Sequence, residues 1–317
     1  ILRGPNQNVF IKLILQASSN FEACFFRYNT MSTNNIRIAV QKSGRLSDDS
    51  LKLFKECGIK FESGGSKLRS ISSNFPIEFL FLRDDDIPGY VEDGVADLGV
   101  VGLNVLMEHT RKVEIVKELG FSKCRLSLAI PRSETYTDLS QFEGKSIATS
   151  YPNLTNQFLQ KNGVNAEMHE ISGSVEIAPS IGLAEGICDI VSTGGTLLSN
   201  GLKEVATVFQ SQAVMISNNA LSAEKQAILN KLLFRIDSVQ RGQNAKYVVL
   251  NVQEQNIEKV TTLLPGMKSP SVLPLATKGW FSLHSVIEEN DFWNIIENLR
   301  DAGAEGILVL PIEKMIL

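Results

Sequence analysis

Short apolar runs alternate with helical stretches along most of the chain. Residues 36–40 (IRIAV) and 77–81 (IEFLF) are predicted to be strands, because each is a short run rich in branched and aromatic residues. Between them we expect a helix with a cap at Ser47 and an acidic first turn. Its apolar residues recur at helical spacing: Leu51, Phe54 and Cys57. This alternation predicts an α/β architecture with largely parallel sheets.

One segment of the chain is echoed by a later one. Residues 94–102 (GVADLGVVG) match residues 186–194 (GICDIVSTG) in a glycine, an aspartate and a final glycine. Each copy is expected to end a helix, turn at the aspartate and run as a strand into glycine. The segments that open the two halves are also alike, since a strand, a polar turn and a helix follow one another in both. We therefore expect two similar α/β lobes facing each other; chance resemblance is the alternative, because such strands are common.

The pattern changes after Asn219. Ser222 is expected to cap a long helix with one apolar stripe. The elements predicted beyond it are strand 246–252, helix 254–264, strand 271–275, strand 279–286, helix 290–302 and strand 305–312. This βαββαβ order is that of the ferredoxin-like unit. It predicts a small third domain, of a size that often relies on a partner surface.

The first residues of the sequence do not share this pattern. Residues 1–30 show no steady hydrophobic period and precede Met31, which we interpret as the start of the folded protein. A targeting peptide is the alternative, although the segment has few arginines and no small-residue cleavage site. The expected domains are a leader at 1–30, a first lobe at 31–125 plus about 205–222, a second lobe at 126–204, and a third domain at 223–317.

Composition and charge narrow the classes of function. The chain has 31 Lys and Arg against 35 Asp and Glu, for a net charge of −4, and 43% of its residues are hydrophobic. A generic nucleic-acid binder is usually basic, so nucleic acid is not an expected partner. The 4 cysteines and 3 histidines are too scattered to indicate zinc or a disulfide framework. No apolar run approaches the roughly 20 residues of a membrane helix, and a cytoplasmic protein with no membrane partner is expected.

A turn rich in Ser, Thr and Gly is the strongest chemical signal. It follows Asp189 and an apolar strand, precedes a helix, and consists of Ser192, Thr193, Gly194, Gly195 and Thr196. Backbone N–H groups, hydroxyls and the helix N-terminus converge there, as in sites that hold phosphate. The alternative is a sharp strand-to-helix turn that binds no ligand. It is not a Walker motif, which ends in Gly-Lys-Ser/Thr.

The first lobe has a matching polar turn with two cations. Lys42, Gly44 and Arg45 follow the first strand, at the edge where open α/β sheets place their ligands. The two side chains could contact phosphate oxygens or the plane of a base. Solvated surface cations are the alternative.

Two groups of carboxylates need separate interpretations. Asp84, Asp85 and Asp86 look like a magnesium cluster, but Asp86 can equally cap a short helix with Pro88 in its first turn. Glu176 lies shortly before the phosphate turn, where it could reach a sugar hydroxyl or Mg²⁺. Its alternative is an acidic residue in a first helical turn.

Several of these segments together resemble the ATP phosphoribosyltransferase family. The segments are 40–49 (VQKSGRLSDD), 83–88 (RDDDIP), 97–102 (DLGVVG), 124–129 (CRLSLA), 147–152 (IATSYP), 173–176 (GSVE), 189–196 (DIVSTGGT) and 308–315 (LVLPIEKM). The resemblance runs from Met31 to the last residue. It implies the long form of this enzyme, the first committed step of histidine biosynthesis. It also implies two lobes of the periplasmic-binding-protein type II fold and a ferredoxin-like regulatory domain that binds histidine.

The resemblance implies a reaction and roles for the candidate residues. The family joins N1 of ATP to C1 of 5-phosphoribosyl 1-pyrophosphate (PRPP) and releases pyrophosphate, with Mg²⁺ carried largely by the pyrophosphate and no metal ligand assigned. Glu176 and Asp189 are the implied catalytic residues, near the ribose hydroxyls or the metal. The implied PRPP-binding residues are Ser192, Thr193, Gly194, Gly195 and Thr196, and the implied nucleotide-binding residues are Lys42, Gly44, Arg45, Asp97 and Gly102.

The resemblance further implies regulation and assembly. Histidine is expected to bind as an inhibitor within 223–317, to residues that the sequence does not identify, and the chain is expected to form dimers that pair into hexamers. A non-catalytic bilobal protein that binds a small anion is the alternative, because fold alone does not settle function.

Overall fold

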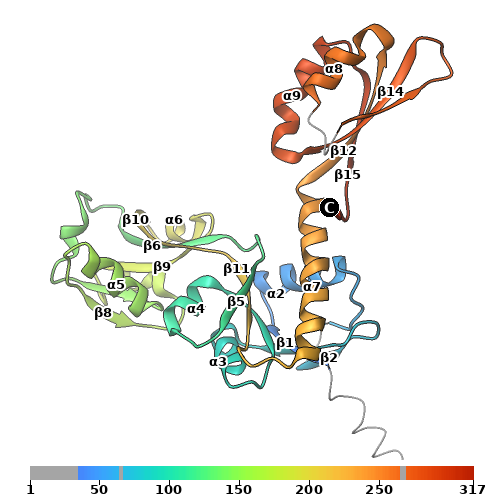
Figure 1. Ribbon diagram of the computed structural model, residues 1–317. Helices are drawn as coiled ribbons and strands as arrows, with labels where there is room; N and C mark the ends of the chain where they lie inside the picture. Colours follow the sequence, from blue (N-terminus) through green and yellow to red (C-terminus); the bar gives the residue numbers. More distant parts are fainter. Residues whose placement is uncertain (1–34, 64–66, 265–268) are drawn as a thin grey trace, which may run out of the picture.

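The computed structural model describes residues 35–63, 67–264 and 269–317. The predicted leader, residues 1–30, and the interpretation of Met31 lie outside the described residues. The described chain forms three sheets, one in each of two α/β lobes and one in a C-terminal domain that extends beyond the long helix α7 (Ala223–Gln243) (Figure 1). The predicted fold class is therefore confirmed.

The first lobe is a six-stranded sheet in the order β2-β3-β1-β4-β11-β5. Its strands are β1 (Ile36–Gln41), β2 (Arg69–Ile71), β3 (Ile77–Leu82), β4 (Leu98–Gly102), β5 (Glu114–Glu118) and β11 (Ala213–Ser217). Its helical elements are α2 (Arg45–Glu56), η1 (Asp84–Asp86), α3 (Ile87–Glu92) and α4 (Leu103–His109). Helix α2 begins two residues before the predicted cap. Gly44 is the residue that precedes the helix, and Ser47 is buried inside its first turn.

The second lobe is a five-stranded sheet in the order β10-β6-β9-β7-β8. Its strands are β6 (Cys124–Pro131), β7 (Ser146–Thr149), β8 (Glu167–Glu170), β9 (Gly186–Val191) and β10 (Leu202–Ser211). Its helical elements are η2 (Leu139–Phe142), α5 (Pro152–Lys161), η3 (Val175–Ile177), η4 (Pro179–Ile181) and α6 (Gly195–Ser199).

The two lobes share one strand plan. Three parallel strands, β3-β1-β4 in one lobe and β8-β7-β9 in the other, are followed by two antiparallel neighbours. In each lobe the first of these antiparallel neighbours, β11 or β6, begins just after the chain has crossed from the other lobe. The echo in the sequence thus located two equivalent strands, β4 and β9, and the expected pair of similar lobes is confirmed.

The echo does not align the two copies residue by residue. Leu98 pairs with Ile38 in the first lobe, and Gly186 pairs with Ile147 in the second, so the strand register makes Gly186 the equivalent of Leu98. The residue that precedes β4, Asp97, is then equivalent to Glu185 and not to Asp189, which lies inside β9.

The domain limits seen in the structure differ from the expected ones in two places. The predicted return to the first lobe near residue 205 falls inside β10, which belongs to the second sheet, and the chain rejoins the first sheet at Ala213. Helix α7 was expected in the third domain, yet its apolar stripe packs into the core of the first lobe. The residues that make this contact are Leu229, Leu232, Ile236 and Val239.

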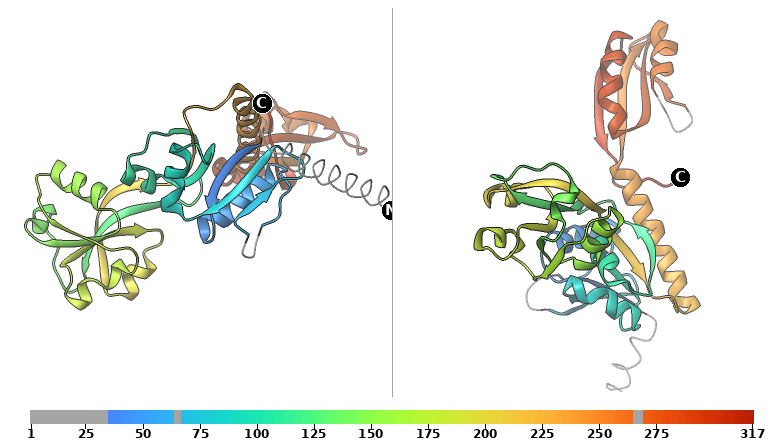
Figure 2. Two further views of the ribbon diagram at one scale, coloured as in Figure 1. Left: turned by 90° about the horizontal axis from the view of Figure 1, so that it is seen from below. Right: turned by 90° about the vertical axis from the view of Figure 1, so that its left-hand side faces the viewer.

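The third domain begins where α7 ends. Its elements are β12 (Ala245–Gln253), η5 (Glu254–Asn256), α8 (Ile257–Leu263), β13 (Ser271–Pro274), β14 (Trp280–Glu288), α9 (Glu289–Asp301) and β15 (Glu305–Pro311). The antiparallel sheet runs β13-β14-β12-β15, and both helices lie on one of its faces (Figure 2). The predicted ferredoxin-like βαββαβ order is confirmed.

The segment after β15 returns to α7. The Met315 N–H donates to the Ser238 carbonyl at 2.8 Å. A Cβ atom on Gly242 would lie 2.8 Å from the carbonyl oxygen of Ile312, so glycine is needed for this close approach. The third domain is thereby joined to α7 at both of its ends.

Two expectations about the chain as a whole can be compared with the described part. None of the described helices combines the length and apolar character that a membrane crossing requires. Among the described cysteines, Cys57 and Cys188 are buried free thiols and Cys124 is a half-buried one.

Candidate active site

The carboxyl-terminal ends of the parallel strands in the two lobes face each other. Arg45, which follows β1, donates from Nη1 to Oγ of Ser192, which follows β9, at 3.1 Å. Ligands of open α/β sheets bind beyond the carboxyl ends of the strands. The contact therefore brings the two predicted polar turns together across one interlobe site.

Helices α4 and α5 hold the lobes together beside this site. The Glu108 carboxylate accepts hydrogen bonds from the backbone N–H groups of Asn153 (2.8 Å) and Leu154 (3.0 Å), at the first turn of α5. Asn104 donates from Nδ2 to the hydroxyl of Tyr151 at 2.9 Å. Glu108 is only 4% exposed, so its charge is satisfied by the helix N-terminus and not by water.

The Ser/Thr/Gly turn is open on the side that a ligand would approach. Ser192, Thr193, Gly195 and Thr196 are exposed, while Gly194 has a left-handed backbone with φ of 83° that glycine adopts without strain. A Cβ atom on Gly195 would meet only Oγ1 of Thr193, at 3.8 Å. No side chain of the described residues therefore fills the space above this glycine.

Arg125 holds the backbone of the turn in place. It donates from Nη1 to the Ser192 carbonyl at 3.3 Å. Its Nε and Nη2 donate to the two carboxylate oxygens of Glu204, each at 2.6 Å. A bidentate pair fixes the plane of the guanidinium, and so the position of the Ser192 backbone.

Asp189 and Glu176 lie close enough to influence each other. Burial raises the pKa of Asp189, and the charge of Glu176 raises it further, while a hydrogen bond from the Ile190 N–H lowers it. Glu176 is brought here by a sharp turn in which Gly173 and Ser174 both have positive φ, of 88° and 53°. A left-handed serine is strained, which is common where a loop positions functional groups.

The first-lobe side of the site contains four of the predicted nucleotide-binding residues. Lys42 and Arg45 are exposed, and Gly44 has φ of 97°, so glycine is needed where the turn enters α2. Gly102 ends β4, and a Cβ atom there would lie 2.5 Å from Oδ1 of Asn104. Gly102 thus leaves room for the Asn104 amide that reaches the second lobe.

Asp97 is not at this edge, and its predicted role needs correction. It lies before β4, at the opposite end of the strand, where its Oδ2 accepts the Arg37 N–H at 2.8 Å and its carboxylate pairs with Lys225 at 2.7 Å. Glu185 makes the equivalent bond in the second lobe, to the Ser146 N–H at 2.8 Å. A carboxylate at this position is therefore a structural feature repeated in both lobes. In the first lobe, the Asp97 carboxylate is already bound to Arg37 and Lys225.

The three consecutive aspartates match neither proposal made from the sequence. Asp86 precedes α3 but its side chain makes no capping hydrogen bond. The described residues contain no group of three or more His, Cys, Asp or Glu side chains placed to hold a metal ion. Burial and the neighbouring charge of Asp84 raise the pKa of Asp85, so the segment is a local concentration of negative charge beside the site.

Four residues of the site were not assigned from the sequence. Arg125 is inside a strand, and Asn104 and Glu108 are inside a short helix, so no turn signal marks them. Tyr151 falls in the polar turn after β7. Asn104, Glu108 and Tyr151 become functional candidates through pairing across the lobes. Arg125 becomes one through its contacts with Ser192 and Glu204 in its own lobe.

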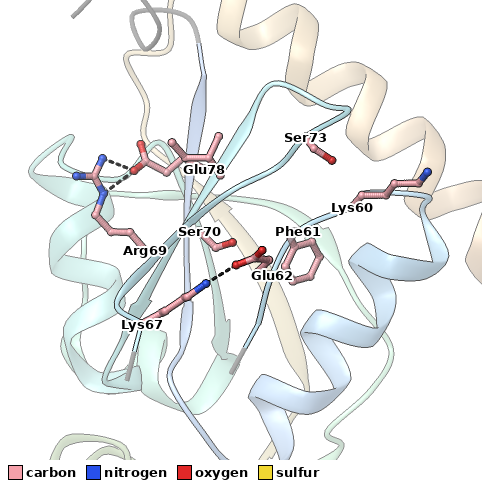
Figure 3. A pocket seen from close by; sticks show the side chains of 9 residues that line it. Lys60, Phe61, Glu62, Lys67, Arg69, Ser70, Ser73 and Glu78 are labelled. Carbon is pink, nitrogen blue, oxygen red and sulfur yellow. Dashed lines mark hydrogen bonds and ion pairs between the residues drawn. The ribbon is translucent and has the colours of Figure 1, made fainter. Parts of the chain in front are cut away.

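A large surface cavity lies elsewhere. It has a volume of about 930 Å³ and lies at the β2–β3 side of the first lobe, lined by Lys60, Phe61, Lys67, Arg69 and Glu78 among others (Figure 3). Arg69 donates there to the Glu78 carboxylate. None of the candidate residues lines it, so the cavity is not part of the interlobe site.

The comparisons with known proteins show the family to which the chain belongs. A model of the ATP phosphoribosyltransferase family matches residues 83–238, and a model of the C-terminal domain of that family matches residues 242–314. The chain belongs to the ATP phosphoribosyltransferase family. The family resemblance drawn from the sequence motifs is therefore confirmed.

Relatives of the family align over nearly their whole length. The ATP phosphoribosyltransferase of Cytophaga hutchinsonii is 59% identical over 281 residues, covering 89% of this chain and 98% of the relative. That of Phocaeicola vulgatus is 55% identical over 282 residues, covering 89% of this chain and all of the relative. A solved ATP phosphoribosyltransferase (HisG:HisZ) complex from Thermotoga maritima matches with a TM-score of 0.54 and 28% identity, covering 63% of this chain and 98% of that one.

Asp97→Asn should destabilise the protein without removing nucleotide binding. The substitution leaves Lys225 without its partner in a largely buried pair, which typically costs about 3–5 kcal/mol. Denaturant unfolding measures the loss. Glu92→Gln, which breaks the more exposed pair with Arg111, should cost less than about 1 kcal/mol. A stable Asp97→Asn protein that no longer binds ATP would restore the original assignment.

Proposed function

We propose that this protein transfers the 5-phosphoribosyl group of PRPP to N1 of ATP. The products are N1-(5-phospho-β-D-ribosyl)-ATP and pyrophosphate, and the reaction is the first step of histidine biosynthesis. Membership of the ATP phosphoribosyltransferase family supports the proposal. The contact between Arg45 and Ser192 carries it structurally, since it sets a cationic turn opposite an open turn of phosphate-binding character.

The second lobe would hold the donor. The exposed turn 192–196 offers hydroxyls and backbone N–H groups to the 5′-phosphate, and Gly194 and Gly195 permit close approach of the backbone. Asp189 and Glu176 would then lie near the ribose, where carboxylates can accept hydrogen bonds from its hydroxyls.

The first lobe would hold the nucleotide. Lys42 and Arg45 can pair with phosphate oxygens, and a guanidinium can also stack on a base. Gly44 and Gly102 shape this wall, because each occupies a position where a side chain would be strained or would collide.

The chemistry needs positioning more than proton transfer. The C1–O bond of the donor breaks, the electron pair leaves with pyrophosphate, and the N1 lone pair forms the new bond to C1. N1 carries no proton that must be removed, so no strong base is required. The lobes would align the two substrates and keep out water that would hydrolyse the donor.

Mg²⁺ fits this site as an ion brought largely by the substrate. Mg²⁺ commonly keeps waters and takes one or two carboxylates together with substrate phosphates. Asp189 and Glu176 could supply such a pair, since their charges act on each other. The ion would supply neutralisation of the charge on the leaving group.

Ultraviolet absorbance tests the function directly. Alkylation of adenine at N1 changes its chromophore, so mixing the protein with ATP, Mg²⁺ and PRPP should produce a time-dependent change that requires all components. The alternative, a non-catalytic anion-binding protein, would bind PRPP in calorimetry and give no change in absorbance.

Gly195→Ala should weaken PRPP binding without destabilising the protein. The backbone of Gly195 is not left-handed and its Cβ would have room, so the fold should tolerate the methyl group. The methyl would instead occupy the approach of the phosphate. We expect at least a tenfold loss of affinity in titration calorimetry, equivalent to about 1.4 kcal/mol.

Gly89→Ala is the matched control. Gly89 lies in α3, and a Cβ atom there would meet nothing within 4 Å. The PRPP affinity of the Gly89→Ala variant should therefore equal that of the unmodified protein. Normal PRPP affinity in Gly195→Ala would contradict the assignment of the turn.

Arg45→Ala should raise the Michaelis constant for ATP. A hydrogen bond to a charged group contributes about 1.5–3 kcal/mol, which corresponds to a rise of roughly tenfold or more. Steady-state kinetics at saturating PRPP measure it. Lys52→Ala, which removes an exposed cation from the same helix, should leave this constant unchanged; an unchanged constant in Arg45→Ala would refute the nucleotide assignment.

Histidine inhibition through the third domain is a further part of the proposal. The match to the family's C-terminal domain supports it, and α7 gives a physical route, because this helix is packed in the first lobe and joined to both ends of the third domain. Coupling of about 1–3 kcal/mol between the sites suffices for strong inhibition. The residues that contact histidine stay unassigned.

A chain that ends at Asn244 should keep activity and lose its response to histidine. It retains all of α7 and therefore the core of the first lobe. A chain that ends at Ser222 should fail to fold, because Leu229, Leu232 and Ile236 leave that core. Activity at increasing histidine concentration measures the response, and an active Asn244-terminated chain that is still inhibited would contradict the assignment.

Assembly and location stay predictions. Exposed apolar side chains of the third-domain sheet are typical of a surface covered by a partner, which supports homo-oligomers; they include Val272, Leu273, Leu308 and Leu310. Dimers that pair into hexamers, and a cytoplasmic location, remain expectations from the family resemblance.

A further inference from the structure

We propose that the phenol of Tyr151 donates a hydrogen bond to a ribose hydroxyl of the donor substrate and so contributes to recognition of the sugar. The inference rests on the proposed function, because it deepens the role of the PRPP side of the interlobe site. It is carried by the hydrogen bonds that leave this phenol with one unused donor at the strand edge.

The backbone of Tyr151 is fixed by two buried threonines. Its N–H donates to Oγ1 of Thr149 at 2.9 Å, and its carbonyl accepts from Oγ1 of Thr155 at 2.7 Å. Both threonines are fully buried. The base of the side chain is therefore held at one place, between the end of β7 and the start of α5.

A directional chain of hydrogen bonds then sets the role of the phenol oxygen. Ser211 donates to Oδ1 of Asn104 at 2.7 Å, and its Oγ accepts the Asn104 N–H at 3.0 Å. The Asn104 amide, with its oxygen so engaged, donates from Nδ2 to the phenol oxygen of Tyr151 at 2.9 Å. The phenol is an acceptor in this bond, and its own proton has no acceptor among the residues that the structure describes, so it can be donated to another group.

The surroundings of the phenol keep that proton in place. Burial raises the pKa of Tyr151 well above its usual value, and the negative charges of Asp189, Asp84 and Asp85 raise it further. Asp189 belongs to the same lobe, whereas Asp84 and Asp85 follow β3 of the other lobe. Tyr151 therefore keeps its phenolic proton and can donate a hydrogen bond, and carboxylates of both lobes act on it.

The same surroundings select the kind of group that can accept the bond. An anionic oxygen would be repelled by the three carboxylates. A neutral hydroxyl can accept from the phenol and donate its own proton to a carboxylate. Thr149 pairs with Cys188 in the sheet, so Tyr151 lies beside the end of β9 near Asp189 and the phosphate turn. A ribose attached to a phosphate in that turn presents such hydroxyls.

Donor analogues lacking one ribose hydroxyl test the proposal. The unmodified protein should use PRPP at least tenfold more efficiently, in kcat/KM, than its 2-deoxy or its 3-deoxy analogue, because a site built for a hydroxyl is left with unpaired groups by the analogue. Tyr151→Phe should raise the Michaelis constant for PRPP about tenfold, leave that for ATP unchanged, and lower the discrimination against the same analogue.

Two further variants separate recognition from structure. Tyr136→Phe is the matched control, since Tyr136 is in the same lobe with its ring 6.5 Å from that of Phe142; it should keep full discrimination. Asn104→Ala removes the orienting amide and should lower discrimination in part. Combined with Tyr151→Phe it should lower discrimination no further than Tyr151→Phe alone.

The outcomes distinguish this inference from the proposed function. If the unmodified protein forms no product, the proposed function fails. If it forms product but uses both deoxy analogues as well as PRPP, the role of Tyr151 is overturned without any variant. Unchanged discrimination in a folded Tyr151→Phe protein, or an equal rise in the Michaelis constants for PRPP and ATP, overturns it as well.

Discussion

The geometry of the site depends on one buried charge, the Glu108 carboxylate. Two strand crossings connect the lobes, and hinged crossings alone would leave their relative angle free. Glu108 adds a contact away from the crossings, since its carboxylate receives two N–H groups from the first turn of α5. A buried carboxylate without such partners would be costly, so the helix N-terminus stays in place. The contacts of Asn104 with Tyr151, and of Arg45 with Ser192, both require this alignment.

The repeat in the sequence shows what a single chain can and cannot reveal. The matching glycines and aspartates located β4 and β9, and with them the two-lobe fold. They misaligned the copies, because an aspartate before a strand and an aspartate within a strand look alike in sequence. Hydrogen bonds resolve the ambiguity. Asp97 and Glu185 each accept an N–H of the neighbouring strand. Asp189 instead accepts the Ile190 N–H of its own strand.

A similar limit explains the placement of α7. Its apolar stripe and its Ser222 cap were evident, and the Ser222 side chain accepts the Lys225 N–H as a cap should. The sequence of an amphipathic helix does not indicate, however, against which core the helix packs. The apolar stripe of α7 packs against the core of the first lobe. The strands and helices of the third domain were predictable, because the hydrophobic period of a strand or a helix is contained within its own segment. The contacts of Glu108 across the lobes, and those of Arg125 within the second lobe, join residues far apart in sequence and have no local signal.

The distribution of charge across the site fits the proposed chemistry. The chain carries a net charge of −4, yet both proposed substrates are anions, so their binding must come from local groups. Arg45 and Lys42 lie on one side and the Ser/Thr/Gly turn on the other, where phosphates would sit. Asp189 and Glu176 belong to the second lobe, where their charges act on each other, and the ribose would lie beside them. Loss of pyrophosphate leaves positive charge on the ribose, which nearby carboxylates stabilise, while cations and N–H groups stabilise the phosphates on either side. A protein that only stored a small anion would gain nothing from negative groups beside its site, because they would weaken the binding of that anion.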